Sequence, residues 1–107
     1  MRGLETFSQL LENVAYNEYK VNLVSISDAP RFAHRQLMID TSRHFLSVRS
    51  ILKTLDAMEM NKLNVLHWHV VDDQSFPFVS ESYPQLARNG SWSPMHIYTV
   101  QDVEKVP

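Results

Sequence analysis

The sequence of 107 residues contains no cysteine, no long apolar run and no strong excess of either charge. Without cysteine, the chain can form neither a disulfide framework nor a metal site with thiolate ligands. Its formal net charge of −2 gives neither the basic surface of a nucleic-acid-binding protein nor a polybasic membrane patch. No apolar stretch approaches the roughly 20 residues that span a bilayer. We therefore expect no nucleic-acid partner and no membrane span.

The two ends of the sequence also lack features of a complete chain. The first 14 residues carry no apolar core of a signal peptide, so we expect either a cytosolic protein or a longer chain that starts upstream. Near the other end, Thr99 and Asp102 predict the start of a helix. Pro107 follows within two turns, and proline interrupts a helix. We expect a truncated or alternatively spliced product, or a partial gene model.

The N-terminal third of the sequence predicts one helix and one strand. Apolar residues recur at helical spacing over residues 4–14 and predict a helix there. Alternation and β-branched residues over 18–26 predict a strand, in a hairpin or an extended arm. Residues 27–35 form a connector, in which Pro30 favours extended backbone before it.

The middle of the sequence predicts a strand, a helix and a second strand. The first strand covers residues 36–40, and the second covers 63–71. Between them, residues 47–61 have one apolar face and predict an amphipathic helix with Ser47 as its N-cap. A long loop over 73–98 is expected to follow, and loops of that length are usually functional or disordered.

Asp40 ends the first of these strands, and Asp72 directly follows the second. The spacing matches a β-α-β unit, and continuously apolar strands are typical of a parallel sheet covered by helices. Because both strands end in a carboxylate, the pattern favours an α/β fold of the (β/α) barrel type, whose chemistry lies at the carboxyl ends of the strands. A doubly wound sheet would place its ligands similarly, so the pattern alone does not separate the two folds.

The stretch NVLHWHVVDD offers one possible metal site. In a strand, His67 and His69 point to the same face and could ligate zinc. On that assumption Asp72 lies on the opposite face, and a third ligand would have to be Asp73, beyond the strand. An open catalytic zinc site needs three protein ligands. We therefore favour the alternative, in which both histidines form hydrogen bonds within a packed sheet.

Three further polar residues each allow more than one interpretation. Asp72 could be an acid/base group or the carboxylate that orients a histidine, or it could cap a loop. Arg43 follows the first strand and could donate hydrogen bonds to vicinal hydroxyls or to a neighbouring acid. Asn89 begins the triplet NGS, which is either an N-glycosylation acceptor or a plain Asn-Gly turn.

The stretches HRQLMIDTSRHF, NKLNVLHWHVVDDQSFP and HIYTVQDV resemble the β-N-acetylhexosaminidases, glycoside hydrolases of family 20, in their animal lysosomal α/β-subunit form. RGLETFSQL resembles the segment that joins their small N-terminal α/β domain to the catalytic barrel. The resemblance implies that residues 1–29 are the end of that N-terminal domain with its linker. Residues 30–107 would be the start of a truncated (β/α)8 TIM barrel, with its first two strands and first helix.

The resemblance also implies an activity, the removal of terminal β-linked N-acetylglucosamine or N-acetylgalactosamine from oligosaccharides or glycolipids. In the family's retaining mechanism the substrate's own acetamido oxygen attacks the anomeric carbon. An Asp of the enzyme holds the acetamide, and an adjacent Glu protonates the leaving oxygen. By position, Arg43 would bind outer hydroxyls of the sugar, and Asp72 would orient a histidine expected beyond Pro107. No metal and no cofactor is implied.

This chain carries no GGDE motif, in which the family has its Asp-Glu pair. We therefore expect a glycosidase fragment that is inactive alone. By the same resemblance, the full-length protein would be lysosomal or secreted and would form a homo- or heterodimer of hexosaminidase subunits. The alternatives are a non-catalytic short isoform that binds a full-length subunit or, more weakly, a metal-dependent barrel hydrolase.

Overall fold

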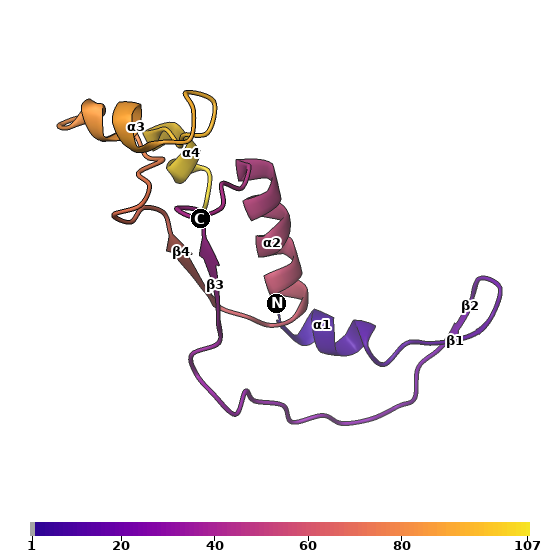
Figure 1. Ribbon diagram of the computed structural model, residues 1–107. Helices are drawn as coiled ribbons and strands as arrows, with labels where there is room; N and C mark the ends of the chain where they lie inside the picture. Colours follow the sequence, from indigo (N-terminus) through magenta and orange to yellow (C-terminus); the bar gives the residue numbers. More distant parts are fainter. Residues whose placement is uncertain (1) are drawn as a thin grey trace. The chain divides into compact units, whose positions relative to one another are not determined.

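The computed structural model describes residues 2–107 of the chain, in two compact units. The first unit is Met1–Arg35 and the second is Gln36–Pro107. Figure 1 shows the helices and strands of each unit along the sequence.

The first unit contains one short helix and a β-hairpin. Helix α1 covers Arg2–Ser8, and strand β1, Glu12–Ala15, pairs antiparallel with β2, Glu18–Lys20. Asn17 lies in the turn between the strands with a φ of 57°, in the left-handed region that asparagine tolerates better than most residues.

Both predictions for this part of the chain were wrong in extent. The helix expected over 4–14 ends at Ser8, because the turn at Asn17 folds residues 12–15 back against β2 and so into extended backbone. The strand expected over 18–26 stops at Lys20, which pairs with the first residue of β1. The hairpin itself agrees with the expected arrangement.

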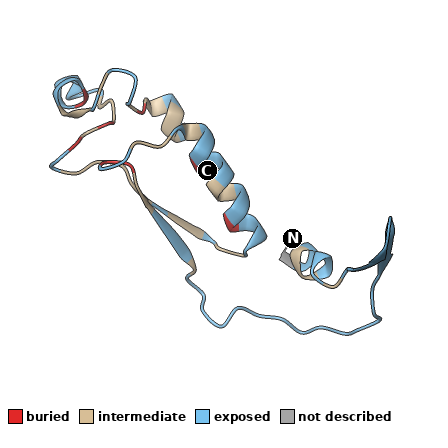
Figure 2. Cartoon of the chain, turned by 45° about the vertical axis from the view of Figure 1, so that its right-hand side comes forward, coloured by how far each residue is buried: buried red, intermediate tan, exposed pale blue. Residues whose placement is uncertain are grey.

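Residues 3–35 contain no buried side chain, and Figure 2 accordingly draws this unit in pale blue and tan without red. The exposed fraction reaches 95% at Tyr16 and 102% at Leu23. All residues that are classed as buried in the described chain therefore lie in the second unit.

The second unit is built on a parallel β-α-β motif, as predicted. Strands β3, Gln36–Asp40, and β4, Val65–His69, pair in parallel, so that Asp40 lies opposite His69. Helix α2, Val48–Met60, connects them (Figure 1). Strand β4 is shorter than the predicted 63–71.

The expected N-cap of α2 is confirmed. The Ser47 hydroxyl accepts a hydrogen bond of 3.2 Å from the Ser50 N–H and so satisfies one of the unpaired donors of the first turn. Ile51 and Met58 are the buried residues of the helix, with exposed fractions of 0% and 4%. This amphipathic helix thus has the apolar face that the sequence predicted.

The segment that follows β4 contains two short helices. Helix α3, Pro84–Gly90, lies within the region that was predicted as a long loop, so that prediction was wrong. Pro84 is at the start of α3, where its missing N–H costs nothing, and Ala87 is buried. Helix α4, Val100–Glu104, begins with the predicted cap: Thr99 accepts from the Asp102 N–H, and the Asp102 carboxylate accepts from the Thr99 N–H.

Tyr98 is at the centre of the packing in this unit and is fully buried. Its ring stacks on Phe45 at 4.6 Å and meets Trp68 edge-on at 4.9 Å, measured between ring centroids. Its hydroxyl donates to the Leu46 carbonyl and accepts from the Leu46 N–H, while burial raises its pKa. The backbone N–H of Tyr98 donates to the Pro77 carbonyl at 2.7 Å. These contacts fix the chain that leaves β3 against the segment that leaves β4.

None of the helices in residues 2–107 has the length and apolar character that crossing a membrane requires.

Candidate functional site

Four polar side chains meet where β3 and β4 end. Asp40 and His69 are the last residues of the two strands and lie opposite each other in the sheet. Arg43 comes from the turn after β3, and Asp72 comes from the turn after β4. We call these four residues the strand-end cluster. The parallel register places both turns at the same edge of the sheet, as the sequence predicted for two carboxylates.

Arg43 is the cation of the strand-end cluster. Its Nη1 atom lies 2.9 Å from Asp40 Oδ2, 2.7 Å from Asp72 Oδ2 and 3.1 Å from His69 Nε2. Within residues 2–107, the Nε and Nη2 groups of this guanidinium make no hydrogen bond, and 48% of the side chain is exposed. One corner of the guanidinium is therefore held by two carboxylates, while its other N–H groups remain available.

The turn that carries Arg43 is held by its own polar groups. Asp40 Oδ1 accepts hydrogen bonds from the backbone N–H of Ser42 at 2.9 Å and of Arg43 at 3.1 Å. Desolvation works against the ionised Asp40 carboxylate, but these two N–H groups and the Arg43 guanidinium outweigh it and lower the pKa of Asp40. Ser42 is fully buried, and its hydroxyl donates to the Ser75 carbonyl at 2.9 Å. This last bond joins the turn after β3 to the turn after β4.

Asp72 is the second carboxylate of the cluster. Its Oδ1 accepts from the Asp73 N–H at 2.8 Å, and its Oδ2 lies 2.8 Å from His69 Nε2 and forms an ion pair with Arg43 Nη1 at 2.7 Å. The Asp73 N–H, the His69 ring and the Arg43 charge together lower the pKa of Asp72 to about 2. The carboxylate is therefore ionised at any pH near neutrality.

The contact between His69 and Asp72 corrects the sequence analysis. Asp72 was expected on the opposite side of the strand from the two histidines, on the assumption that the strand continued to residue 71. Strand β4 ends at His69, so the alternation of faces stops there and the turn brings Asp72 back to the imidazole. His69 is thus a member of the site that the sequence pattern did not indicate. The available signal was a histidine at a strand end with an acidic residue three positions later.

The possible zinc site receives no geometric support from the described residues. Within residues 2–107, no group of three or more His, Asp or Glu side chains is arranged to hold a metal ion. His69 belongs to the strand-end cluster, whereas His67 is exposed and makes no contact with that cluster among the described residues.

Asn89 lies in the last turn of α3 and is exposed. The alternative of an Asn-Gly turn was therefore wrong, because both residues belong to the helix. The Gly90 carbonyl accepts from the Phe76 N–H at 2.8 Å and from the Ser75 hydroxyl at 3.0 Å. A Cβ atom on Gly90 would lie 3.0 Å from Phe76 Cβ, so this close approach explains why the residue after Asn89 is glycine.

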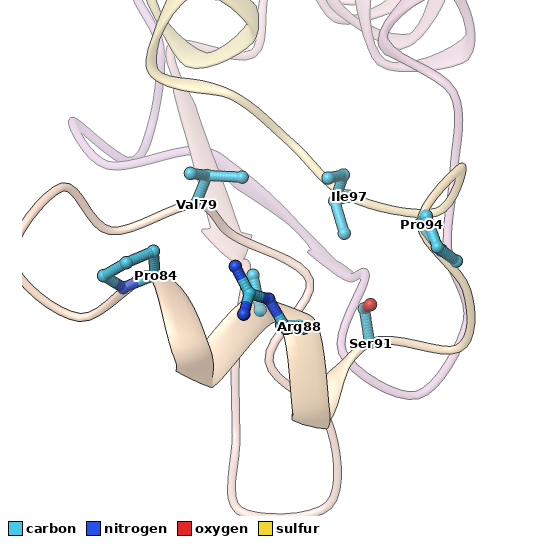
Figure 3. Close-up of a pocket in the computed structure, with 7 residues that line it drawn as sticks. Val79, Pro84, Arg88, Ser91, Pro94 and Ile97 are labelled. Atoms are coloured by element: carbon cyan, nitrogen blue, oxygen red, sulfur yellow. The ribbon is translucent and has the colours of Figure 1, made fainter.

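Helix α3 also forms one wall of a cavity of about 330 Å³ (Figure 3). Most of its lining is apolar, and Arg88 and Ser91 add polar groups. The lining residues are Val79, Pro84, Ala87, Arg88, Ser91, Pro94 and Ile97. None of them belongs to the strand-end cluster.

Known proteins resemble this chain in both sequence and fold. Residues 32–107 match the family model described as the catalytic domain of glycosyl hydrolase family 20. The β-hexosaminidase subunit beta of Mus musculus is 58% identical over 106 residues, and the subunit alpha of Rattus norvegicus is 55% identical over 107 residues. Each alignment covers 99% of this chain and 20% of the relative. The chain thus spans about a fifth of the length of these relatives.

Solved structures also resemble this chain in sequence and fold. A chitobiase from Flavobacterium johnsoniae has a TM-score of 0.88 and 39% identity, over 98% of this chain and 16% of that one. A family-20 β-N-acetylhexosaminidase from Streptomyces coelicolor A3(2) has a TM-score of 0.82 and 34% identity, over 97% of this chain and 23% of that one.

Proposed function

Because this chain belongs to glycosyl hydrolase family 20, we propose that it forms part of a β-N-acetylhexosaminidase. The substrates would be oligosaccharides or glycolipids, and the products released would be terminal N-acetylglucosamine and N-acetylgalactosamine. Residues 1–29 would be the end of an N-terminal α/β domain and its linker. Residues 30–107 would begin a (β/α)8 barrel, with β3 and β4 as its first two strands.

The observation that carries this proposal is the geometry of Arg43. Its Nη1 atom is held by Asp40 and Asp72, and its remaining N–H groups are free of partners in the described chain. A planar guanidinium donates several hydrogen bonds in fixed directions, which suits the adjacent hydroxyls of a sugar ring. Because the two carboxylates hold the side chain before substrate arrives, little entropy is lost on binding. We therefore propose Arg43 as a substrate-binding residue.

Asp72 would support catalysis without transferring a proton. An efficient general acid needs a pKa near the working pH, whereas Asp72 has a pKa of about 2. Its permanent negative charge instead suits the orientation of an imidazole. In the substrate-assisted mechanism of this family, an Asp holds the substrate acetamide and a Glu protonates the leaving oxygen. We propose that Asp72 supports the histidine that contacts this Glu.

The same proposal implies a location, an assembly and a modification for the full-length protein. The full-length protein would act in the lysosome or outside the cell, as a homo- or heterodimer of hexosaminidase subunits. Asn89 would then be exposed to the glycosylation machinery on the surface of α3. The mechanism would need no metal and no cofactor.

A segment exchange tests the proposed function. Residues 1–107 replace the aligned 106 residues of the mouse subunit beta, and the chimaera is purified from cells that lack their own hexosaminidase. We expect it to hydrolyse a fluorogenic N-acetylglucosaminide. A chimaera that folds, with a cooperative thermal transition, but shows no turnover would contradict the proposal. The unmodified mouse subunit is the positive control.

A further inference from the structure

We propose that His69 is a positioning residue that fixes Asp72 and Arg43 relative to each other, so that the guanidinium is presented to the substrate in one orientation. This inference rests on the proposed sugar-binding function. His69 would touch neither the substrate nor the reacting atoms. It would act only through the two residues that it contacts.

The hydrogen-bond geometry determines the role of the imidazole. Arg43 Nη1 carries two hydrogens but lies close to three atoms: Asp40 Oδ2 at 2.9 Å, Asp72 Oδ2 at 2.7 Å and His69 Nε2 at 3.1 Å. Its hydrogen bonds run to Asp40 Oδ2 and to His69 Nε2, and Asp72 Oδ2 adds an ion pair. The imidazole nitrogen therefore contacts the guanidinium directly.

The same Nε2 atom also lies 2.8 Å from Asp72 Oδ2. With the proton on Nε2 the imidazole donates to this carboxylate, and with the proton on Nδ1 the Nε2 atom accepts from Arg43 Nη1. In either tautomer one nitrogen atom contacts both side chains. Asp72 Oδ1 is held separately by the Asp73 N–H. The carboxylate of Asp72 thus has little freedom to rotate.

The backbone position of His69 explains why it sets the geometry. Arg43 and Asp72 both lie on turns, whereas His69 is the last residue of β4 and belongs to the paired sheet. Its carbonyl accepts from the Thr41 N–H at 3.0 Å, which extends the pairing by one residue. A side chain on a hydrogen-bonded strand is a more rigid reference than one on a turn. The imidazole therefore gives the Arg43 and Asp72 side chains a fixed point of contact.

The test uses three substitutions at His69 in the chimaera described above. His69→Gln keeps an amide N–H near the position of Nε2, whereas His69→Asn places its amide closer to the backbone and His69→Ala has no donor. We expect His69→Ala and His69→Asn to lower kcat/KM for an aryl N-acetylglucosaminide by about tenfold, mostly through KM, because a binding contact is lost. His69→Gln should recover most of this loss. His67→Ala, on the exposed residue two positions earlier in β4, is the matched control and should change kcat/KM by less than about twofold.

A double substitution separates positioning from general packing. If His69 acts through Arg43, adding His69→Ala to Arg43→Ala should lower kcat/KM little further, whereas independent effects would multiply. Activity that is unchanged in His69→Ala, or lost equally in His69→Gln, would overturn the inference. The proposed function would still stand in either case if Arg43→Ala lowers activity. An Arg43→Ala chimaera with full activity would instead contradict the proposed sugar contact itself.

Discussion

Arg43 Nη1 lies 2.7 Å from Asp72 Oδ2, so an ion pair joins the turns that follow two neighbouring parallel strands. The Arg43 side chain is 48% exposed and the Asp72 side chain is 30% exposed. Ion pairs with this exposure contribute little to folding, because water screens them. The ion pair therefore matters for orientation, because it holds a flexible guanidinium in one direction.

Arg43→Ala in the chimaera should lower kcat/KM for an aryl N-acetylglucosaminide by about tenfold or more, because the pocket loses its hydrogen-bond donor to the sugar hydroxyls. Its thermal midpoint should change little, because water screens the exposed ion pair that Arg43 forms. Steady-state kinetics and calorimetry measure the two effects. Arg49→Ala, on the exposed side of α2, is the matched control. A loss of less than about threefold would contradict the proposed contact between Arg43 and the substrate.

Asp72→Asn should lower kcat and move the acidic limb of the pH–rate profile. The substitution keeps the shape of the side chain and removes the charge that would orient the histidine in contact with the catalytic Glu. Asp72 itself stays ionised over the usual assay range, since its pKa is about 2, so the limb moves through the groups that its charge influences. Asp56→Asn, at an exposed position of α2, controls for the loss of one carboxylate. A profile that superimposes on that of the unsubstituted chimaera would reduce Asp72 to a loop cap.

The same carboxylate predicts a dependence of stability on acid. The pKa of Asp72 is lowered from 3.8 to about 2 in the folded chain, so folding favours its ionised form. This contribution is fully present above pH 4 and is lost as the pH falls towards 2. The thermal midpoints of the unsubstituted and Asp72→Asn chimaeras should therefore converge as the pH falls from about 5 to 2. A difference that stays constant over this range would show that the ionisation of Asp72 is not linked to folding.

Asn89 should carry an N-linked glycan when the chain is expressed behind a secretion signal. The sequon lies on the exposed surface of α3, where a glycan meets no packed side chain. Treatment with an N-glycosidase should then lower the apparent mass, and Asn89→Gln should abolish the shift. Expressed without the signal, the chain should run at its unmodified 12.5 kDa. A secreted product without any glycosidase-sensitive shift would remove Asn89 from the modified sites.

Residues 1–107 expressed by themselves should neither hydrolyse N-acetylhexosaminides nor unfold cooperatively. The sheet of β3 and β4 has only two strands, and Leu37 and Met38 on β3 are 38% and 53% exposed. So little buried apolar area does not offset a backbone entropy of roughly 1–2 kcal/mol per residue.

Catalysis by the isolated chain should fail for a second reason. General acid catalysis contributes a factor of about 10²–10⁴, and the sequence contains no GGDE motif to supply the acid. Circular dichroism during a urea titration and a fluorogenic assay measure the two expectations. A cooperative transition from a monomer would refute the first, and turnover that Asp72→Asn abolishes would refute the second.

The sequence alone determined the elements whose signals are local. Strand β3, helix α2 with its Ser47 cap and the Thr99 cap of α4 were all predicted, because each depends on residues within one or two turns of one another. Two strands that each lead to an aspartate also predicted the edge of the sheet at which the cluster forms.

Only the tertiary structure determined which side chains meet where the strands end. No local pattern indicates that β4 stops at His69, because the apolar run continues to Val71. The pairing of β4 with β3 ends at His69, opposite Asp40. The buried Ser42–Ser75 hydrogen bond then joins the two turns that follow. The position of Asp72 beside His69 thus depends on contacts between residues far apart in the sequence, and a pattern with a period of two along one strand does not contain them.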